Sequence, residues 1–485
     1  MASAGWSRVA ALAGLTIVII AVLAGLGALL APSWERPTYP DQPRVLPAVP
    51  PSGAPAGSNG RLPHEDLEVK VADTTLGATV VSPPGEGPHP ALVFVHGGGS
   101  ATRAAYLDQA ERMAELGVVA VIYDKRTVGY TFRERDYGQL ADDALAMAQA
   151  VSSRPDVDPD RVGLWGISEG GWVVPLAAGR GTGVGYVVLA AAPTVSPGAQ
   201  LSWALDDGLR RQDAPDGARR LAARALALGE FDYVRHDPLP PLRGVRQPVL
   251  AYYPTLDRAV PPAQSARMLA DTLDAAGNRA YTIRFIIGAD HGMRVDGELA
   301  PGYLTGMASW IHDLPDLPQP QVAGPEPVQH ALAVAQPTEL LRAPVVAGLL
   351  MLIAVGYLAG PLAGAAARRR GHRSTMPPPL RRRLRWAVAS GLSTVVGLNV
   401  VIGLLVTVAF AGGPTGLPTA AWVLLRLAAV GTVVLAVVAG TGVVDAWRGG
   451  WRPSGADRTA LVGATGATGL VLLLAGYWEL FALGW

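Results

Sequence analysis

The chain contains no cysteine, and only 16% of its 485 residues are charged. Without cysteine, disulfides, thiolate catalysis and cysteine-ligated metal sites are all excluded. The 40 Lys and Arg nearly cancel the 39 Asp and Glu, so the overall charge favours neither nucleic acid nor an acidic polymer as a partner. Lysine is also scarce: the sequence has only Lys70 and Lys125. Half of the residues are hydrophobic, and their distribution carries the next inference.

The hydrophobic residues are gathered in long runs. The uncharged run from Val9 to Ala31 is long enough to cross a bilayer as a helix, and four more apolar runs follow residue 344. Two Pro-rich stretches flank a segment of ordinary globular composition. We therefore predict an N-terminal transmembrane anchor, a linker, a globular domain, a second linker and a four-helix transmembrane region, at residues 1–31, 32–64, 65–316, 317–344 and 345–485, respectively.

The arginines between the apolar runs predict an orientation. Residues 368–385 and 448–458 are rich in arginine, whereas the connection 413–419 carries no charge. Excess arginine marks the cytoplasmic side of a membrane, so the first two segments are expected inside and the third outside. The N-terminus is then cytoplasmic and the globular domain faces outward from the plasma membrane. A cleaved signal peptide would give the same export, but no A-x-A site follows the first run, which favours an uncleaved anchor.

Short apolar runs alternate with helical patterns in the globular segment. Runs of this kind are typical of strands that helices cover on both faces, and their alternation with helices predicts a mostly parallel sheet of the α/β class. The predicted strands are 91–96, 118–124, 161–166, 185–192, 248–253 and 281–287. A polar, Arg-rich segment at 195–245 interrupts the alternation, and we expect it to form a helical cap insertion.

Gly166-Ile167-Ser168-Glu169-Gly170 matches the pattern G-x-S-x-G. In a nucleophile elbow, the glycines permit a tight strand-to-helix turn that exposes the serine hydroxyl. The pattern alone is weak in a chain with 58 glycines. Here, however, it follows a predicted strand and precedes an apolar helical pattern. We therefore predict Ser168 as a nucleophile; the alternative is a loop serine beside glycines.

A serine nucleophile needs a base, and the base needs an orienting carboxylate. In this kind of fold, the acid and then the histidine follow the serine in the chain. His291 lies directly after a predicted strand and is the expected base. His312 falls in a helical pattern and His236 precedes the last strands, so both are weaker candidates.

The expected acid is Asp257, which follows the predicted strand 248–253. Its rival is Asp290, but adjacent loop residues rarely turn their side chains toward each other, and Asp290 adjoins His291. Asp257 as an ordinary turn residue is the remaining alternative.

Acyl transfer also needs donors for a developing oxyanion. His96-Gly97-Gly98-Gly99 ends the predicted strand 91–96, where a hole-forming loop is expected. One donor would be the backbone N–H of Gly97 or Gly98, and the other that of Glu169. The glycine run as a simple turn is the alternative. Neither a metal nor a cofactor is expected.

Together, these stretches resemble α/β-hydrolases, specifically bacterial serine esterases of the EstD-like, dienelactone-hydrolase-related kind. The resemblance covers residues 65–316 and rests on ALVFVHGGG, IYDKRTVGY, DPDRVGLWGISEGG, the segment ending PVLAYYPTLDRAVP, and GADHGM. It implies hydrolysis of a carboxylic ester through an acyl-enzyme, without a metal. Ile167 stands where the family usually has His, and Thr127 where it usually has Gly, which puts the substrate in doubt more than the mechanism.

Three functions remain open. A membrane-anchored extracytoplasmic esterase acting on small esters is favoured. A serine peptidase of the aminopeptidase or prolyl-oligopeptidase type comes second. The elbow does not discriminate between the two, but residues 1–64 are too short for a propeller domain, which disfavours the large prolyl-oligopeptidase versions. A non-catalytic membrane binding protein comes third. Protein partners are not predicted, and the lipid bilayer is expected to surround the helices.

Two further features have alternative interpretations. Asp124, Lys125 and Arg126 either line the site or form an ordinary salt-bridged loop. Arg426 and Glu479 are charged residues within predicted membrane spans, at similar depth from the outer face, and we expect them to pair. The alternative is that each reaches the interface independently.

Overall fold

Residues Arg36–Ala204 and Phe231–Ala333 form one unit of the computed structural model, called here the sheet unit. Met1–Glu35, Leu205–Glu230 and Val334–Trp485 form a second, the helical unit. Much of both predicted linkers lies outside the described residues. The structure describes residues 2–35, 42–49, 60–99, 101–131, 133–180, 183–229, 232–314, 316, 320–331, 333–336 and 342–482.

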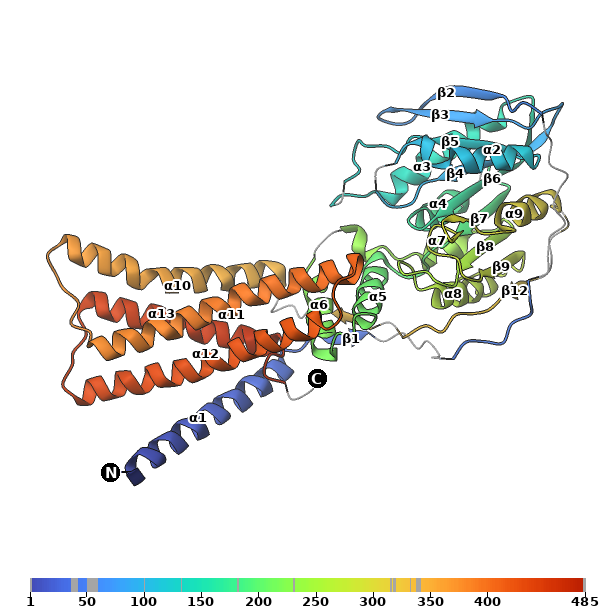
Figure 1. The fold of residues 1–485 in the computed structure, drawn as a ribbon. Helices are drawn as coiled ribbons and strands as arrows, with labels where there is room; N and C mark the ends of the chain where they lie inside the picture. Colours follow the sequence, from blue (N-terminus) through green and yellow to red (C-terminus); the bar gives the residue numbers. More distant parts are fainter. Residues whose placement is uncertain are drawn as a thin grey trace. The chain divides into compact units, whose positions relative to one another are not determined.

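In the part of the chain that the structure describes, the sheet unit is built on nine strands in the order β12-β9-β8-β7-β6-β4-β5-β3-β2 (Figure 1). All neighbours from β12 to β5 are parallel, whereas β3 is antiparallel to both β5 and β2. The carboxyl ends of the parallel strands therefore meet at one edge. The strands are β2 (His64–Lys70), β3 (Thr75–Val81), β4 (His89–Val95), β5 (Val119–Tyr123), β6 (Val157–Ile167), β7 (Tyr186–Ala190), β8 (Val249–Pro254), β9 (Tyr281–Ile286) and β12 (Gln321–Ala323).

Helices cover both faces of this sheet. One face packs against α3 (Tyr137–Ser152), α4 (Gly170–Gly179), α7 (Leu239–Gly244) and α8 (Pro262–Ala275). The other face packs against α2 (Leu107–Glu115) and α9 (Tyr303–His312). Every residue of β5, β7 and β8 is buried, which explains why their sequences are continuously apolar.

The predicted fold class is confirmed: the sheet unit has an α/β-hydrolase fold with a mostly parallel sheet. All six predicted strands are present, with ends that differ by a few residues. The antiparallel strands β2 and β3, the three-residue strand β12, and a small hairpin of β10 (Arg294–Val295) and β11 (Glu298–Leu299) were not predicted. They are short or half exposed, so their apolar pattern is weak.

Among its described residues, the helical unit contains five helices that are long and apolar enough to cross a membrane. α10 packs along α13, α11 packs along α12, and α1 contacts both α12 and α13. Small residues allow close approach: an added Cβ at Gly356 of α10 would lie 2.8 Å from the carbonyl oxygen of Gly463 in α13. The helices are α1 (Ala2–Leu29), α10 (Ala343–Arg369), α11 (Pro378–Ala411), α12 (Leu417–Arg448) and α13 (Gly455–Tyr477). A short antiparallel pair, β1 (Ser33–Glu35) with β13 (Val334–Gln336), belongs to the same unit.

The middle of the predicted cap insertion belongs to the helical unit. This part holds the end of α5 (Pro197–Arg210) and all of α6 (Asp216–Ala227). Leu209 and Leu221 are buried in one apolar cluster with Trp422 and Leu425 of α12. An added Cβ at Gly217 would lie 2.5 Å from the Trp422 ring, so α6 approaches α12 closely. This stretch of the insertion is therefore bound to the long helices.

The two charged residues of the spans have other partners than expected. Glu479 accepts hydrogen bonds from Arg220 and Arg224 of α6, and Arg224 also donates to the carbonyl oxygen of Tyr477. Arg426 donates to the backbone carbonyl oxygens of Leu480 and Ala482, next to Glu479 in the chain. The insertion supplies the cations for Glu479 because α6 lies against the end of α13.

Candidate active site

Ser168 lies in the turn between β6 and α4 with a φ of 53°, in the left-handed region that side chains rarely adopt. The turn is possible because its flanking glycines have no side chain. An added Cβ at Gly166 would lie 2.5 Å from the carbonyl oxygen of Gly170, and one at Gly170 would lie 2.8 Å from that of Val95. The local structure is therefore that of a nucleophile elbow, in which a strained serine follows a buried strand.

His291 and Asp257 are joined by a hydrogen bond. Nδ1 of His291 lies 3.0 and 2.9 Å from the two carboxylate oxygens of Asp257. The Asp257 carboxylate is fully buried and also accepts the backbone N–H groups of Ala259 and Val260. Burial lowers the pKa of His291, but the hydrogen bond and charge of Asp257 outweigh burial and hold that pKa above its ordinary value of 6.5.

The rival candidates are occupied elsewhere. The Asp290 carboxylate accepts the N–H groups of Gly292 and Arg294, which closes its own loop. Nε2 of His312 lies 2.9 Å from the carbonyl oxygen of Leu116. His236 packs against aromatic rings, edge-on to that of Tyr137. Among the predicted histidines and acids, the structure thus brings His291 and Asp257 together.

The predicted oxyanion loop follows β4 and lies against the elbow. An added Cβ at Gly97 would be 3.6 Å from Cβ of Ser168, so the glycine backbone approaches the serine closely. Nε2 of His96 lies 2.5 Å from the carbonyl oxygen of Tyr123, which ties the end of β4 to β5. The N–H of Gly99 is taken by the hydroxyl of Tyr130, so Gly97 and Gly98 remain the expected donors.

Glu169, the residue after the elbow serine, lies at the centre of a buried polar network. Its carboxylate accepts hydrogen bonds from Lys125 Nζ at 2.6 Å and from the Tyr130 hydroxyl at 2.7 Å. Arg135 donates to the other carboxylate oxygen. The side chains of Lys125 and Glu169 are each only 3% exposed. The sequence left a substrate contact by the Glu169 side chain open, since its backbone role already explained the position, and it did not predict this network.

The same network holds the oxyanion loop. Lys125 donates a second hydrogen bond, of 2.6 Å, to the carbonyl oxygen of Gly97, and the Tyr130 hydroxyl receives the N–H of Gly99. Burial lowers the pKa of Lys125, although the Glu169 carboxylate opposes that shift. Burial and the nearby Glu169 charge raise the pKa of Tyr130, which keeps its hydroxyl protonated as a donor.

Residues 124–126 were expected either to line the site or to form an ordinary salt-bridged loop, and each alternative holds for part of this segment. Lys125 belongs to the site, as described above. Arg126 forms a buried ion pair with Asp143 and reaches Asp73, while Asp124 accepts the backbone N–H of Arg103. These flanking contacts are structural and fix the loop that presents Lys125. Within the described residues, no group of three or more His, Asp or Glu side chains is arranged to hold a metal ion.

Comparison with known families finds a match for part of the chain. Residues 106–314 match the model of the prolyl oligopeptidase family. The matched range contains Ser168, Asp257 and His291 and indicates a serine hydrolase. Acyltransferase drtE of Aspergillus calidoustus is 30% identical over 176 residues, which are 35% of this chain and 53% of that protein. The chain thus spans about half the length of this curated relative.

Solved structures with both esterase and peptidase names are similar to the chain. The esterase of Pyrobaculum calidifontis is 20% identical with a TM-score of 0.39, over 51% of this chain and 85% of that one. The acylaminoacyl peptidase of Pyrococcus horikoshii is 20% identical with a TM-score of 0.39, over 55% of this chain and 43% of that one. Likenesses at this level do not distinguish substrates.

The buried network predicts that Lys125 positions the oxyanion loop. Lys125→Met removes the hydrogen bond to Gly97 and should lower kcat about ten- to hundredfold. This decrease is no larger than the decrease in kcat that follows the removal of one oxyanion donor. The matched control is Lys70→Met, since Lys70 is the other lysine of the chain and is exposed on β2. Steady-state kinetics on a p-nitrophenyl ester measures both, and equal activity of the two variants would contradict this role.

The Asp257–His291 pair predicts a pH dependence. A histidine base works in its neutral form, so the raised pKa of His291 should place the acidic limb of kcat/KM above pH 6.5. Asp257→Asn removes the charge that raises this pKa; the limb should shift to lower pH and kcat should fall about 10⁴-fold. An unchanged pH profile in Asp257→Asn would move the acid to another residue.

Proposed function

We propose that the protein is a membrane-anchored serine hydrolase that cleaves carboxylic esters through an acyl-enzyme. The observation that carries this proposal is the placement of the hydrogen-bonded Asp257–His291 pair and the strained Ser168 after parallel strands of one sheet. Since the carboxyl ends of β6, β8 and β9 lie at one edge of the sheet, Ser168, Asp257 and His291 all follow strands at that edge. This is the arrangement that acyl transfer by serine requires.

The mechanism follows from the roles that this geometry supports. His291 takes the proton of Ser168 through Nε2, because its Nδ1 is bound to Asp257. The serine oxygen attacks the ester carbonyl, and the negative charge on the carbonyl oxygen is stabilised by the N–H of Glu169 and of Gly97 or Gly98. His291 then protonates the leaving alcohol. Water, deprotonated by His291, releases the acid and restores Ser168.

Peptide hydrolysis is the second candidate, and the family match favours it. The prolyl oligopeptidase model covers the residues that carry Ser168, Asp257 and His291. Ester and peptide cleavage share the acyl-enzyme and differ in the group that leaves, so one set of catalytic residues serves either reaction. An acyl acceptor other than water is the third outcome, in keeping with the printed name of the fungal relative.

The location of the site is also part of the proposal. Five apolar helices have the length to span a membrane, and arginine is concentrated in the connections 370–377 and 449–454 and the helix ends beside them. These features support a chain with a cytoplasmic N-terminus and an extracytoplasmic sheet unit in the plasma membrane. A small ester or a short peptide then reaches Ser168 from outside the cell, and the enzyme needs no metal or cofactor.

The first test uses the full-length chain in detergent, because α6 is packed on the long helices. A fluorophosphonate probe should label the wild type, and Ser168→Ala should abolish the labelling. Retained labelling would assign the nucleophile elsewhere.

On the same preparation, p-nitrophenyl esters of graded chain length should be cleaved faster than aminoacyl-nitroanilides. Faster anilide cleavage would favour the peptidase, and rates that rise with an added alcohol would favour acyl transfer.

The topology test exploits the absence of cysteine, which gives a background free of thiol labelling. Thr415→Cys lies in the uncharged connection between α11 and α12, and Arg452→Cys lies in the connection between α12 and α13. A membrane-impermeant maleimide should label Thr415→Cys in intact cells, and Arg452→Cys only after the cells are permeabilised. The reverse pattern would place the sheet unit in the cytoplasm.

A further inference from the structure

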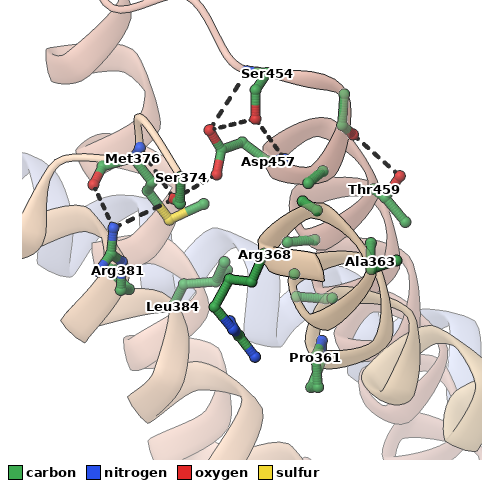
Figure 2. Close-up of a pocket in the computed structure, with 18 of the residues that line it drawn as sticks. Pro361, Ala363, Arg368, Ser374, Met376, Arg381, Leu384, Ser454, Asp457 and Thr459 are labelled. Atoms are coloured by element: carbon green, nitrogen blue, oxygen red, sulfur yellow. Dashed lines mark hydrogen bonds between the residues drawn. The ribbon is translucent and has the colours of Figure 1, made fainter. Parts of the chain in front are cut away.

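A large cavity lies within the helical unit, and none of the residues proposed for catalysis lines it. It has a volume of about 1270 Å³ and is lined by α10, α11 and the first half of α13 (Figure 2). α10 packs along α13 while α11 packs along α12, so the two consecutive helices α10 and α11 belong to different pairs. The cavity occupies the space beside them. It exceeds the range of about 300–1,000 Å³ that is usual for small-molecule pockets.

One end of the cavity is strongly cationic. Five arginines line it, namely Arg368, Arg370, Arg373, Arg381 and Arg385. Among the described residues that line the cavity, Asp457 is the one carboxylate. The excess of arginine on the cytoplasmic side of membrane proteins explains part of this cluster and requires no cavity. The apolar cavity beside these arginines is a second, independent observation, and it points to a bound ligand.

The rim of the cavity is built around Asp457. Its carboxylate accepts hydrogen bonds from Ser374 Oγ at 2.6 Å, from Thr375 Oγ1 at 2.8 Å and from Ser454 Oγ at 2.8 Å. Figure 2 shows the bonds that Ser374 and Ser454 make to Asp457, together with Arg381, which donates to Ser374 Oγ and to the carbonyl oxygen of Met376. Because Asp457 is bound in this way and buried, its charge holds the 374–376 loop rather than neutralising the arginines.

The remaining walls of the cavity are apolar. They are made largely of small and aliphatic residues, including Gly356, Gly360, Ala460, Ala464 and Leu392. The lining of α10 from Gly356 to Arg368 extends about 18 Å, and that of α11 from Arg381 to Leu392 about 16 Å, at 1.5 Å per residue. One leaflet of a bilayer contributes about 15 Å of hydrocarbon. The cavity is therefore charged at the level of the headgroups and apolar through the depth of one leaflet.

We propose that this cavity binds one anionic phospholipid, with its phosphate on the arginines and its acyl chains along the apolar walls. The proposal rests on the membrane anchoring proposed above. Guanidinium groups bind phosphate oxygens in paired hydrogen bonds, and basic pockets between membrane helices on the cytoplasmic side hold anionic headgroups. A zwitterionic lipid offers the same phosphate but adds an ammonium group, which five arginines repel. The site thus selects lipids by net charge.

The test titrates delipidated full-length protein in detergent with phosphatidylglycerol and with phosphatidylcholine, and counts bound lipids by native mass spectrometry. The wild type should bind one phosphatidylglycerol more tightly than any phosphatidylcholine. The double variant Arg368→Ala/Arg381→Ala should weaken this binding at least about tenfold. Gly364→Leu should weaken it too without a change of charge, because an added Cβ there meets Arg368 at an ordinary 3.5 Å and the rest of the side chain enters the cavity.

The matched control is Arg369→Ala/Arg382→Ala. These arginines are the next residues on the same two helices, are exposed, and do not line the cavity. Equal losses in the two double variants would mean attraction to a basic surface and would overturn the proposal. Wild-type affinity in Gly364→Leu would overturn it as well. If inorganic phosphate displaced the lipid and bound as tightly alone, the occupant would be a free anion and not a lipid.

Two measurements separate this proposal from the proposed function. Thermal denaturation of each variant shows that it is folded, and if the arginine variant is not, Gly364→Leu carries the test. Alkaline carbonate extraction of cell membranes should leave the wild type in the pellet, and its release would refute the membrane anchoring. Fluorophosphonate labelling of Ser168 should be unchanged in all lipid-site variants, so failure of the lipid titration leaves the hydrolase assignment intact.

Discussion

The buried ion pair between Lys125 and Glu169 is the contact on which the geometry of the catalytic edge depends. It joins the residue after the elbow serine to the loop that follows β5, and through Gly97 it joins both to the glycine loop after β4. A buried pair is stable only when its remaining donors and acceptors are satisfied. Tyr130 and Arg135 complete that requirement here, so the network stabilises one arrangement of the two segments that hold the expected oxyanion donors.

The parallel strands of the sheet were predictable because the information is local. Each parallel strand is covered by helices on both faces and therefore appears as a short, continuous apolar run. The chain order of serine, acid and histidine selected Asp257 and His291, and the structure joins these two by a hydrogen bond. Asp290, adjacent to His291 in the sequence, bonds to its own loop, as expected for neighbouring loop residues. The catalytic roles themselves remain predictions.

The partners of buried charges were not predictable from the same patterns. Glu169 and Lys125 are separated by 44 residues, and nothing in the hydrophobic periodicity indicates which cation a buried carboxylate meets. Depth in the membrane suggested Arg426 as the partner of Glu479. The structure instead supplies Arg220 and Arg224, from a segment more than 250 residues earlier, because the apolar face of α6 packs on the long helices. The apolar face of an amphipathic helix indicates that it packs against another element, but the sequence of the helix does not identify that element.

The inclusion of α6 in the helical unit changes how the sheet unit is joined to the long helices. In an ordinary anchored ectodomain, a protease that cuts the linker sheds the enzyme. Here the chain passes between the two units four times, at residues 35–36, 204–205, 230–231 and 333–334. Cuts in both Pro-rich stretches would leave residues 205–230 packed against α11 and α12, so the nicked sheet unit would stay joined to the long helices. Release by proteolysis would require α6 to leave its partners and expose its apolar face to water.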